Sequence, residues 1–475
     1  MKPVRDTWGA MLHTPHGYWL EQVGAVAPAP PLTGDRDADV VVIGGGFTGL
    51  WAAWHLKRLQ PDARVVLLEA DGCGRGPSGR NGGFCNVMWF SLPNMRRRWG
   101  DGPALAVARA AERAVDAIGE FCAEQGVEAG FHAGGYLQVS TAPAQDQVWA
   151  EALAATRELA AADAVQQLSP AEVAARCASP AFRAGAYYPT AATVQPARLA
   201  LGLRERLLER GVELFESTPV RALRDAPDGV EARTPGGRVR AGAAVVAIGG
   251  AARARRGPLR NRLTITSSHI VLTEPVPDLL AEIGWTGGEC ITDCRTMLHY
   301  FRTTADGRIA FGLGGGQISM GARLRGRVEV DPAVVALAAE RLRAYFPGFE
   351  GRRITHAWGG PIDVSPTHLP VVVPLPGGRA FAAAGYTGNG VGPSQLVGRT
   401  LAALALDRRD EYSRLPIVDP SPQRVPPEPF HWLGGSVIRA GIMSKERAEG
   451  EGRAPHPISA ALARIPELIG FHIGR

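Results

Sequence analysis

Three glycines and one acidic residue have the types and the spacing of a phosphate-binding turn. Gly44, Gly46 and Gly49 follow the apolar run at residues 40–43, and a second apolar run ends at Glu69. In a strand, turn and helix of this kind, the first glycine permits the tight turn, the second lets the backbone approach a pyrophosphate, and the third lets the helix pack on the strand. The helix N-terminus then faces the phosphates, and the acid accepts hydrogen bonds from ribose hydroxyls. The pattern therefore predicts a bound dinucleotide.

Two other glycine-dense segments have the composition of ligand-binding loops. Residues 78–83 read Ser-Gly-Arg-Asn-Gly-Gly, which is too rich in turn formers for a helix or a strand. Residues 385–392 follow an apolar strand pattern and precede a helical pattern at 394–406. The N-terminus of that helix would stabilise negative charge on a polar ligand. A purely structural loop is the alternative interpretation of residues 385–392.

The elements that must position these loops form two groups. Apolar strand patterns surround the first motif and return at 243–250 and 380–385, so one sheet is assembled from distant segments. The intervening segments combine short alternating strands with Ala-rich helices, which favours an antiparallel sheet with helices beside it. We therefore predict an α/β fold with a Rossmann-like nucleotide-binding domain and a second, α+β domain. Helices are expected at 102–125, 147–161, 195–210 and 332–346, and strands at 135–140, 212–215, 219–223, 229–239, 262–273, 297–303 and 308–313.

The two ends of the chain lie outside these groups. The N-terminal leader carries aromatic residues, Trp8, Tyr18 and Trp19, that would anchor it across the following domain. The C-terminal extension starts with a proline-rich stretch typical of a linker and has helical spacing at 458–473. Packing on the body of the protein is favoured for it over contact with a partner or a membrane surface. The expected pieces are 1–37 (leader), 38–95, 191–258 and 354–415 (nucleotide-binding domain), 96–190 and 259–353 (second domain), and 416–475 (C-terminal extension).

The composition is that of an ordinary soluble globular protein. The 475 residues carry a net charge of +6, but the arginines are spread along the chain, which argues against nucleic-acid binding. The six cysteines are too scattered for a disulfide framework, and they lack the spacing of a metal site, so reduced thiols are indicated. No segment has the pattern of a signal peptide or a transmembrane span. We expect a cytoplasmic protein.

Several motifs, in order, resemble the flavoproteins of the D-amino-acid oxidase family over about residues 38–410. They are the glycine turn with Glu69, the 78–83 loop, the strand that ends at Gly249, Trp-Gly-Gly-Pro-Ile-Asp at 358–363, and Gly-Tyr-Thr-Gly-Asn-Gly at 385–390. The 78–83 loop is most similar to the γ-glutamylputrescine oxidase branch. The resemblance implies a glutathione-reductase-type domain that binds FAD and not NAD. Because no cysteine follows Cys294, the late covalent linkage of some members is excluded and non-covalent FAD is expected.

The resemblance also implies which residues contact FAD. The glycine turn and Glu69 would hold the ADP half, Val220 would offer backbone hydrogen bonds to adenine, and the 78–83 loop would pass beside the pyrophosphate and the isoalloxazine. Residues 388–391 would lie near the pyrimidine edge, where backbone N–H groups stabilise the negative charge of reduced flavin. The implied cofactor-binding residues are Gly44, Gly46, Phe47, Thr48, Gly49, Glu69, Ser78, Gly79, Arg80, Asn81, Gly82, Gly83, Val220, Gly249, Gly385, Gly388, Asn389, Gly390 and Val391.

Three residues are candidates for the substrate site. Tyr300 and Arg302 lie on a strand where family members place active-site residues, and period-two alternation puts them on one face; an exposed strand pair is the alternative. Asp363 lies near the position where glycine oxidase-like members have an arginine that binds the substrate carboxylate. An acid there would attract an ammonium group, which favours an amine substrate. The alternative is that Asp363 caps a turn with Ser365 and Thr367.

These features predict an FAD-dependent oxidoreductase that oxidises the C–N bond of a small-molecule amine by hydride transfer, giving an imine that hydrolyses to a carbonyl and an amine. A D-amino-acid, glycine or sarcosine-type oxidase or dehydrogenase that binds a carboxylate through Arg302 or another arginine is one alternative. A flavin-binding protein without turnover is another. Some relatives use a lysine over the flavin to promote reaction with oxygen, but none lies between Lys57 and Lys445. The electron acceptor, O2 or another, stays open.

Overall fold

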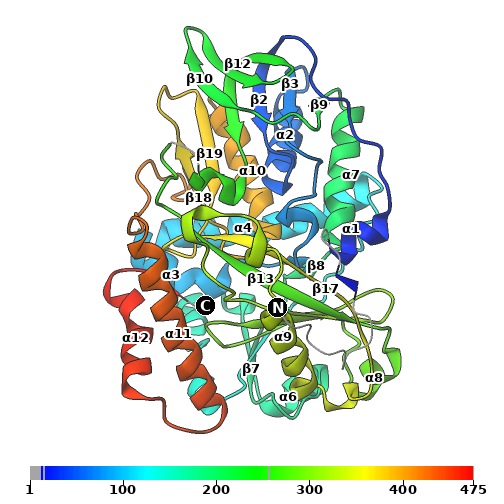
Figure 1. Cartoon of the computed structure of the whole chain (residues 1–475), viewed down its shortest axis with the longest axis vertical. Coiled ribbons are helices and arrows are strands. Elements are labelled where there is room, and N and C mark those ends of the chain that lie inside the picture. Colours follow the sequence, from blue (N-terminus) through cyan, green and yellow to red (C-terminus); the bar gives the residue numbers. More distant parts are fainter. Residues whose placement is uncertain (1–11, 14–16, 255–256, 474–475) are drawn as a thin grey trace.

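Two β-sheets organise the molecule. The computed structural model describes residues 12–13, 17–254 and 257–473. In Figure 1 the sheet that carries the glycine turn lies in the upper part of the molecule, and the second sheet crosses its lower part. The expected fold class is confirmed, with a mixed α/β architecture in which both sheets are assembled from separated stretches of chain.

The upper sheet is built on parallel strands of β-branched residues. Val40 pairs with Val65, and Val42 lies between Leu67 and Val245. All these side chains are buried, as expected for a parallel sheet that is covered on both faces. The strand order is β10 (Ala222–Ala226), β11 (Gly229–Thr234), β12 (Gly237–Val246), β2 (Arg36–Ile43), β3 (Val65–Leu68) and β9 (Glu213–Phe215), with β19 (Ala380–Ala384) beside β12 and β18 (Val371–Pro374) beside β19.

Two helices start at the same edge of this sheet. β2 leads into α2 (Phe47–Leu59) and β19 leads into α10 (Val391–Ala405). Because β2 and β19 both run parallel to β12, the N-termini of α2 and α10 lie at one edge. The two helices pack closely, since a Cβ added at Gly398 would lie 2.6 Å from the Cβ of Trp51. The other helices that pack on this core are α3 (Leu92–Trp99), α4 (Asp101–Glu124), α5 (Ala150–Glu158) and α7 (Pro196–Glu209).

The second sheet is mostly antiparallel, and an aromatic core lies beneath it. Phe301 and Phe311 stack with 5.2 Å between ring centroids, and Trp285 and Phe346 pack against Phe301. The helices α6 (Pro170–Arg176), α8 (Pro277–Glu282) and α9 (Pro332–Tyr345) contribute to the same core. The strand order is β1 (Leu12–His13), β17 (Ile354–Val364), β13 (Thr264–Thr273), β16 (Ile309–Leu313), β15 (His299–Thr303), β14 (Cys290–Asp293), β5 (Tyr136–Val139), β7 (Gly185–Tyr188) and β6 (Gln166–Leu168); β4 (Phe84–Cys85) pairs with β8 (Ala192–Thr193) separately.

The structure corrects some of the expected boundaries. β17 pairs with β13 along its whole length, so residues 354–364 belong to the second sheet, although 354–415 was expected as one piece of the nucleotide-binding domain. The strand expected at 219–223 begins only at Ala222. Of the strand expected at 243–250, residues 243–246 form the end of the long strand β12, and a 3-10 helix starts at Gly249; β12 also supplies one strand of the expected meander. Long-range pairing, which local patterns do not report, accounts for these differences.

Both described ends of the chain pack on the body of the protein. In the leader, α1 (Tyr18–Val23) places the indole N–H of Trp19 2.8 Å from the carbonyl oxygen of Asn81. This confirms the expected anchoring for the described part of the leader; Trp8 lies outside the described residues. At the other end, α11 (Phe430–Gly450) and α12 (Pro457–Leu468) stand side by side along one flank of the molecule (Figure 1). No helix in the described part of the chain is long and apolar enough to cross a membrane.

Candidate active site

The glycine turn between β2 and α2 has no room for larger side chains. Gly44 has a φ of +110°, and a Cβ there would lie 2.3 Å from the carbonyl oxygen of Ala247. A Cβ at Gly49 would lie 1.9 Å from the carbonyl oxygen of Gly44, so α2 could not pack against the turn. Glycine at these positions therefore brings the first N–H groups of α2 to the edge of the sheet, which is the arrangement that binds phosphate.

Glu69 lies at the end of β3, next to this turn. Its Oε2 accepts a hydrogen bond from Gly45 N at 2.6 Å, and its Oε1 accepts one from Asp71 N at 2.9 Å. Burial raises the pKa of this carboxyl, and the two backbone donors oppose the rise. The carbonyl of Glu69 accepts from Thr218 N, which brings the buried Val220 into the same region. The turn, the acid and the 218–220 segment thus converge as the ADP half of FAD requires.

The 78–83 loop closes over the N-terminus of α2. Ser78 Oγ accepts a hydrogen bond from Phe47 N at 2.8 Å. Within the loop, Asn81 Nδ2 donates to Ser78 O and Asn81 Oδ1 accepts from Gly83 N, at 2.8 and 2.7 Å. The carbonyl of Arg80 accepts from the indole of Trp358 at 2.8 Å. These bonds connect α2, the 78–83 loop and β17.

The third glycine segment lies across from this loop. Thr48 Oγ1 and the hydroxyl of Tyr386 are 2.6 Å apart, which links the starts of the two motifs. Asn86 Nδ2 donates to Asn389 Oδ1 at 3.1 Å. Gly388 has a φ of +80°, and the turn ends at Gly390 where α10 begins. The loops predicted to contact FAD from three parts of the sequence are thus neighbours. The groups that meet here, a helix N-terminus, an acid and glycine-lined turns, fit that cofactor.

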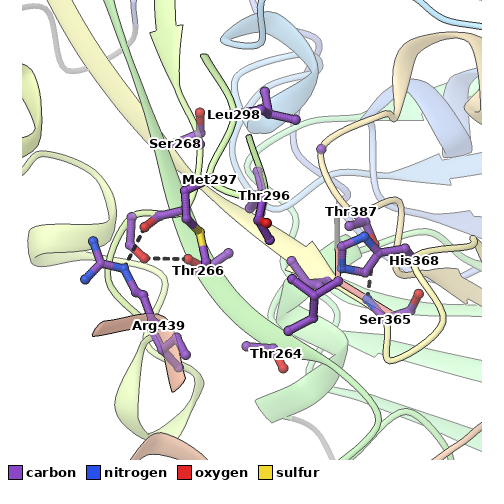
Figure 2. Close-up of a pocket in the computed structure, with 18 of the residues that line it drawn as sticks. Thr264, Thr266, Ser268, Thr296, Met297, Leu298, Ser365, His368, Thr387 and Arg439 are labelled. Atoms are coloured by element: carbon purple, nitrogen blue, oxygen red, sulfur yellow. Dashed lines mark hydrogen bonds between the residues drawn. The ribbon is translucent and has the colours of Figure 1, made fainter. Parts of the chain in front are cut away.

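A cavity of about 430 Å³ lies between these loops and the second sheet, and Figure 2 shows part of its lining. The predicted residues Arg80, Asn81, Gly82, Gly388, Asn389 and Val391 line one side. The second sheet supplies residues of strands β13 and β15, of the loop before β15 and of the loop after β16. They are Thr264, Thr266, Ser268, Ile270, Met297, Leu298, Tyr300, Gly315 and Ile318. The C-terminal extension supplies Pro426, Phe430, His431, Gly434, Gly435, Ile438, Arg439, Ile442, Pro466, Ile469, Phe471, His472 and Ile473.

Tyr300 is the predicted catalytic residue that faces this cavity. Its hydroxyl lies 2.6 Å from Ser268 Oγ, and a Cβ at Gly82 would lie 3.1 Å from its ring. Burial raises the pKa of Tyr300 to about 12. The hydroxyl therefore keeps its proton at neutral pH. Because Ser268 Oγ donates to Leu313 O at 3.1 Å, the Tyr300 hydroxyl donates to Ser268 Oγ, and its oxygen can accept a further hydrogen bond beside the 78–83 loop. Gly312 makes room for the ring, because a Cβ there would lie 2.0 Å from Tyr300 Cζ.

Arg302 and Asp363 do not line the cavity. Arg302 is buried, and its Nη1 donates to Val194 O at 2.6 Å and to Gly83 O at 3.4 Å. Burial lowers the pKa of Arg302 to about 10. Asp363 Oδ2 accepts from Gly385 N at 2.8 Å, and burial raises its pKa to about 6. The position of Asp363 outside the lining does not favour the expected contact with a substrate ammonium, and among the described residues its side chain does not form the alternative turn cap with Ser365 and Thr367. Arg302 and Asp363 both hold backbone.

The charge of the cavity differs from what Asp363 suggested. Among the residues that the structure describes, no aspartate or glutamate lines it, whereas Arg80 and Arg439 do. Burial lowers the pKa of His431 to about 4 and also lowers that of His472, so both imidazoles are neutral at pH 7. The lining is otherwise mostly apolar. A positively charged cavity disfavours an ammonium ion and favours the neutral form of an amine.

Sequence reasoning missed the whole contribution of the C-terminal extension to this cavity. Arg439 on α11 donates from Nε to Gly315 O at 2.6 Å, and His472 N donates to Pro366 O at 2.8 Å. No local signal marks these contacts, because each joins residues separated by about a hundred positions in the chain. The available signal was the apolar spacing at 458–473, which indicated a helix but not the surface that it covers.

Known proteins resemble this chain over most of its length. The family described as FAD dependent oxidoreductase (DAO) matches residues 39–404. Gamma-glutamylputrescine oxidoreductase of Escherichia coli is 27% identical over 411 residues, 84% of this chain and 91% of that protein. The probable oxidoreductase OrdL of Rhizobium meliloti is 26% identical over 426 residues, 86% of this chain and 92% of that protein.

Solved structures share the fold. Glycine oxidase from Geobacillus kaustophilus superimposes with a TM-score of 0.66 and 22% identity, covering 82% of this chain and all of that one (100%). L-proline dehydrogenase from P. horikoshii gives a TM-score of 0.67 and 18% identity, covering 82% and 98%. With the glycine turn, Glu69 and the two further loops in place, the match over residues 39–404 shows that the chain belongs to the DAO family of FAD-dependent oxidoreductases.

Proposed function

We propose that this protein oxidises the C–N bond of a small-molecule amine and passes the electrons to O2 or another acceptor. The observation that carries the proposal is the cavity between the flavin-binding loops and Tyr300. It offers a mostly apolar space beside the loops predicted to hold the flavin, which is where a substrate must lie to transfer hydride. The related gamma-glutamylputrescine oxidoreductase supports an amine as substrate class by its name.

The reaction divides between the cofactor and the chain. FAD, when bound, supplies the two-electron acceptor. The carbon next to nitrogen gives up a hydride, and the nitrogen lone pair completes a C=N bond. The iminium ion then takes up water and splits into a carbonyl compound and an amine. We propose that the predicted loop residues hold FAD, and that the Tyr300 hydroxyl oxygen accepts a hydrogen bond from the amine and so orients the substrate.

The chain is proposed to select the neutral amine and not to remove a proton with a carboxylate. No described acid lines the cavity, and the partly buried Tyr300 stays protonated. An ammonium group has no nitrogen lone pair to give to the C=N bond, so the free amine is the reactive form. The two arginines of the cavity favour that form because they repel a cation.

The test is anaerobic mixing of the purified flavoprotein with a panel of alkyl amines, diamines, amino acids and amines that carry a remote carboxylate. Loss of the visible absorbance of oxidised flavin with any of them supports the proposal, and readmission of air then separates O2 from other acceptors. A flavin that no amine or amino acid reduces would contradict it and favour a flavin-binding protein without turnover. We also propose a cytoplasmic location, supported by six cysteines that form no disulfide, which cell fractionation tests.

A further inference from the structure

The C-terminal helices form one wall of the substrate cavity although they lie outside the part of the chain that matches the family. The match ends at residue 404, whereas α11 and α12 occupy Phe430–Gly450 and Pro457–Leu468. Ile438 and Ile442 of α11 face the cavity, and Phe471 closes it beyond α12. The family core supplies the flavin side of the cavity. The extension supplies the opposite side, so this wall is built by residues beyond the stretch that matches the family.

The wall is fixed at several points. The carboxylate of Glu446 accepts a hydrogen bond from Thr296 N, and its backbone carbonyl accepts one from Arg295 Nη1 at 3.1 Å. α11 lies so close to the body that a Cβ at Gly435 would be 2.6 Å from Ile318 Cδ1. A further bond, from His472 N to Pro366 O, holds the end of the extension. Residues on this wall therefore have defined positions relative to the cavity.

Arg439 is the charged residue that the extension adds to the cavity. Its Nε donates to Gly315 O at 2.6 Å, which orients the guanidinium. Among the described residues, no group accepts a hydrogen bond from its two terminal nitrogens, and none forms an ion pair with it. The acid nearest to it in electrostatic effect is Asp331, but the oxygens of Asp331 accept from Gln317 Nε2 and Ala333 N at 3.0 and 3.1 Å. Arg439 thus has no direct ion-pair partner among the described residues.

A partly buried guanidinium with two free N–H edges is a binding site for an anion. Charge-assisted bonds from arginine to a carboxylate are stronger than neutral ones, and the planar fork matches a carboxylate in a bidentate geometry. In Figure 2, Arg439 lies on the opposite side of the cavity from Thr387 and His368, which border the flavin-binding loop. An anion held by Arg439 would therefore be remote from the carbon that is oxidised.

We infer that Arg439 binds a carboxylate carried by the substrate, and that the α11–α12 pair thereby selects amines whose carboxylate is separated from the oxidised C–N bond by an apolar chain. The inference rests on the proposed amine oxidation. The apolar residues between the two ends of the cavity, among them Met297 and Leu298, match such a chain. This specificity is distinct from the expected binding of a carboxylate by Arg302, which is engaged with backbone.

The test compares two substrates and three variants. The substrates are an ω-amino acid and the alkyl amine of the same length without the carboxylate. Arg439→Gln should lower the ratio of kcat/KM for the ω-amino acid to that for the alkyl amine at least tenfold, mainly through KM. Arg439→Lys, which keeps the charge but not the fork, should give an intermediate ratio. Arg447→Gln, which removes an exposed arginine from the same helix, is the control and should leave the ratio unchanged.

Binding provides a readout that does not depend on turnover. Calorimetric titration of the flavoprotein with pentanoate should give measurable heat in the wild type and in Arg447→Gln, and at least tenfold weaker binding in Arg439→Gln. Equal loss for both substrates in Arg439→Gln, or equal binding of pentanoate by all variants, would overturn the inference while leaving amine oxidation intact. If neither substrate reduces the flavin, the proposed function fails instead.

Discussion

The carboxylate of Asp363 accepts a hydrogen bond from the backbone N–H of Gly385, with 2.8 Å between Oδ2 and N. The backbone carbonyl of Asp363 accepts a second bond from Thr387 N at 2.9 Å. One residue of β17 therefore holds the turn that leads into α10 at two points. Since this turn borders the cavity, Asp363 acts on the site by fixing backbone and not by touching the substrate.

Replacing Asp363 by asparagine should change how stability depends on pH. Burial raises the pKa of Asp363 from 3.8 to about 6. Because the pKa is raised in the folded state, the protonated carboxyl contributes to the free energy of unfolding below its ordinary pKa. This contribution, up to about 3 kcal/mol, is lost as the pH rises through 6. Asparagine keeps an acceptor for Gly385 N but does not ionise. Denaturant unfolding of the holoenzyme should therefore show the Asp363→Asn protein gaining stability over the wild type between about pH 4 and about pH 7.

Asp62→Asn, in an exposed turn, is the matched control for this measurement. It should show no comparable gain over the same pH range. A stability difference between Asp363→Asn and the wild type that is the same at both ends of the range would contradict the proposed titration of Asp363.

Arg302→Gln should destabilise the protein. The guanidinium bridges Val194 O and Gly83 O, and its removal leaves the buried Val194 O without this donor, whereas Gly83 O still accepts from Val194 N at 2.8 Å. A loss of about 1–3 kcal/mol is expected, because one unsatisfied buried group costs that much. Thermal unfolding measures this loss, with the exposed Arg221→Gln as control. Normal stability together with a large rise of KM for carboxylated substrates would instead restore Arg302 as the carboxylate-binding residue.

Tyr300→Phe should lower kcat/KM about three- to tenfold without unfolding the protein, because one neutral hydrogen bond is worth about 0.5–1.5 kcal/mol. Ser268→Ala removes the partner of the hydroxyl, which is 2.6 Å away, and leaves the hydroxyl itself in place. It should therefore have the smaller effect. Steady-state kinetics on one amine distinguishes the two variants. Equal activity of Tyr300→Phe and the wild type would exclude the proposed orienting role.

The pH dependence of kcat/KM should be set by the pKa of the substrate amine and not by the pKa of a group on the protein. No described acid lines the cavity, and burial keeps Tyr300 protonated up to about pH 12. The rate constant should therefore rise with pH toward the pKa of the substrate amine, about 10 for an alkyl amine. A substrate whose amine pKa is lower should shift the rise in kcat/KM to lower pH by the difference between the two amine pKa values. A rise near pH 6 to 7 that is the same for all substrates would reveal a base on the protein.

Gly49→Ala should abolish FAD binding. The new Cβ would lie 1.9 Å from Gly44 O, so α2 would have to move away from the turn. Gly102→Ala, on α4, is the control, since a Cβ there meets nothing within 4 Å. The ratio of visible flavin absorbance to protein absorbance in the purified proteins measures the effect. Full flavin content in Gly49→Ala would contradict the placement of FAD at this turn.

The parts of the site that were predictable from the sequence are those determined locally. Gly44 and Gly49 are needed by contacts within one turn, so their spacing reports the structure directly. The helix at α10 was predictable for the same reason, because its apolar pattern follows a glycine turn. The roles of Arg302 and Asp363 were not, since their partners Val194 and Gly385 are distant in sequence and are reached only when strands pair.

The helix α11 illustrates the opposite case. It contains Gly434, Gly435 and Gly441, which weaken a helical pattern, and it follows a proline-rich stretch. The structure explains two of these glycines, since a Cβ at Gly435 would strike Ile318 and one at Gly441 would lie 2.5 Å from Leu462 Cβ. Tertiary packing, and not local propensity, therefore stabilises this helix. Its place over the cavity follows from those same contacts.

The stoichiometry of a single anaerobic turnover shows whether the protein oxidises the C–N bond of an amine. The flavoprotein is mixed with an ω-amino acid that reduces it, and the carbonyl product is trapped and counted against the flavin reduced. One carbonyl should form for each flavin reduced, and the reduction should be slower when the hydrogens on the carbon next to nitrogen are replaced by deuterium. Flavin reduction without a carbonyl product, or no reduction by any amine, would contradict it.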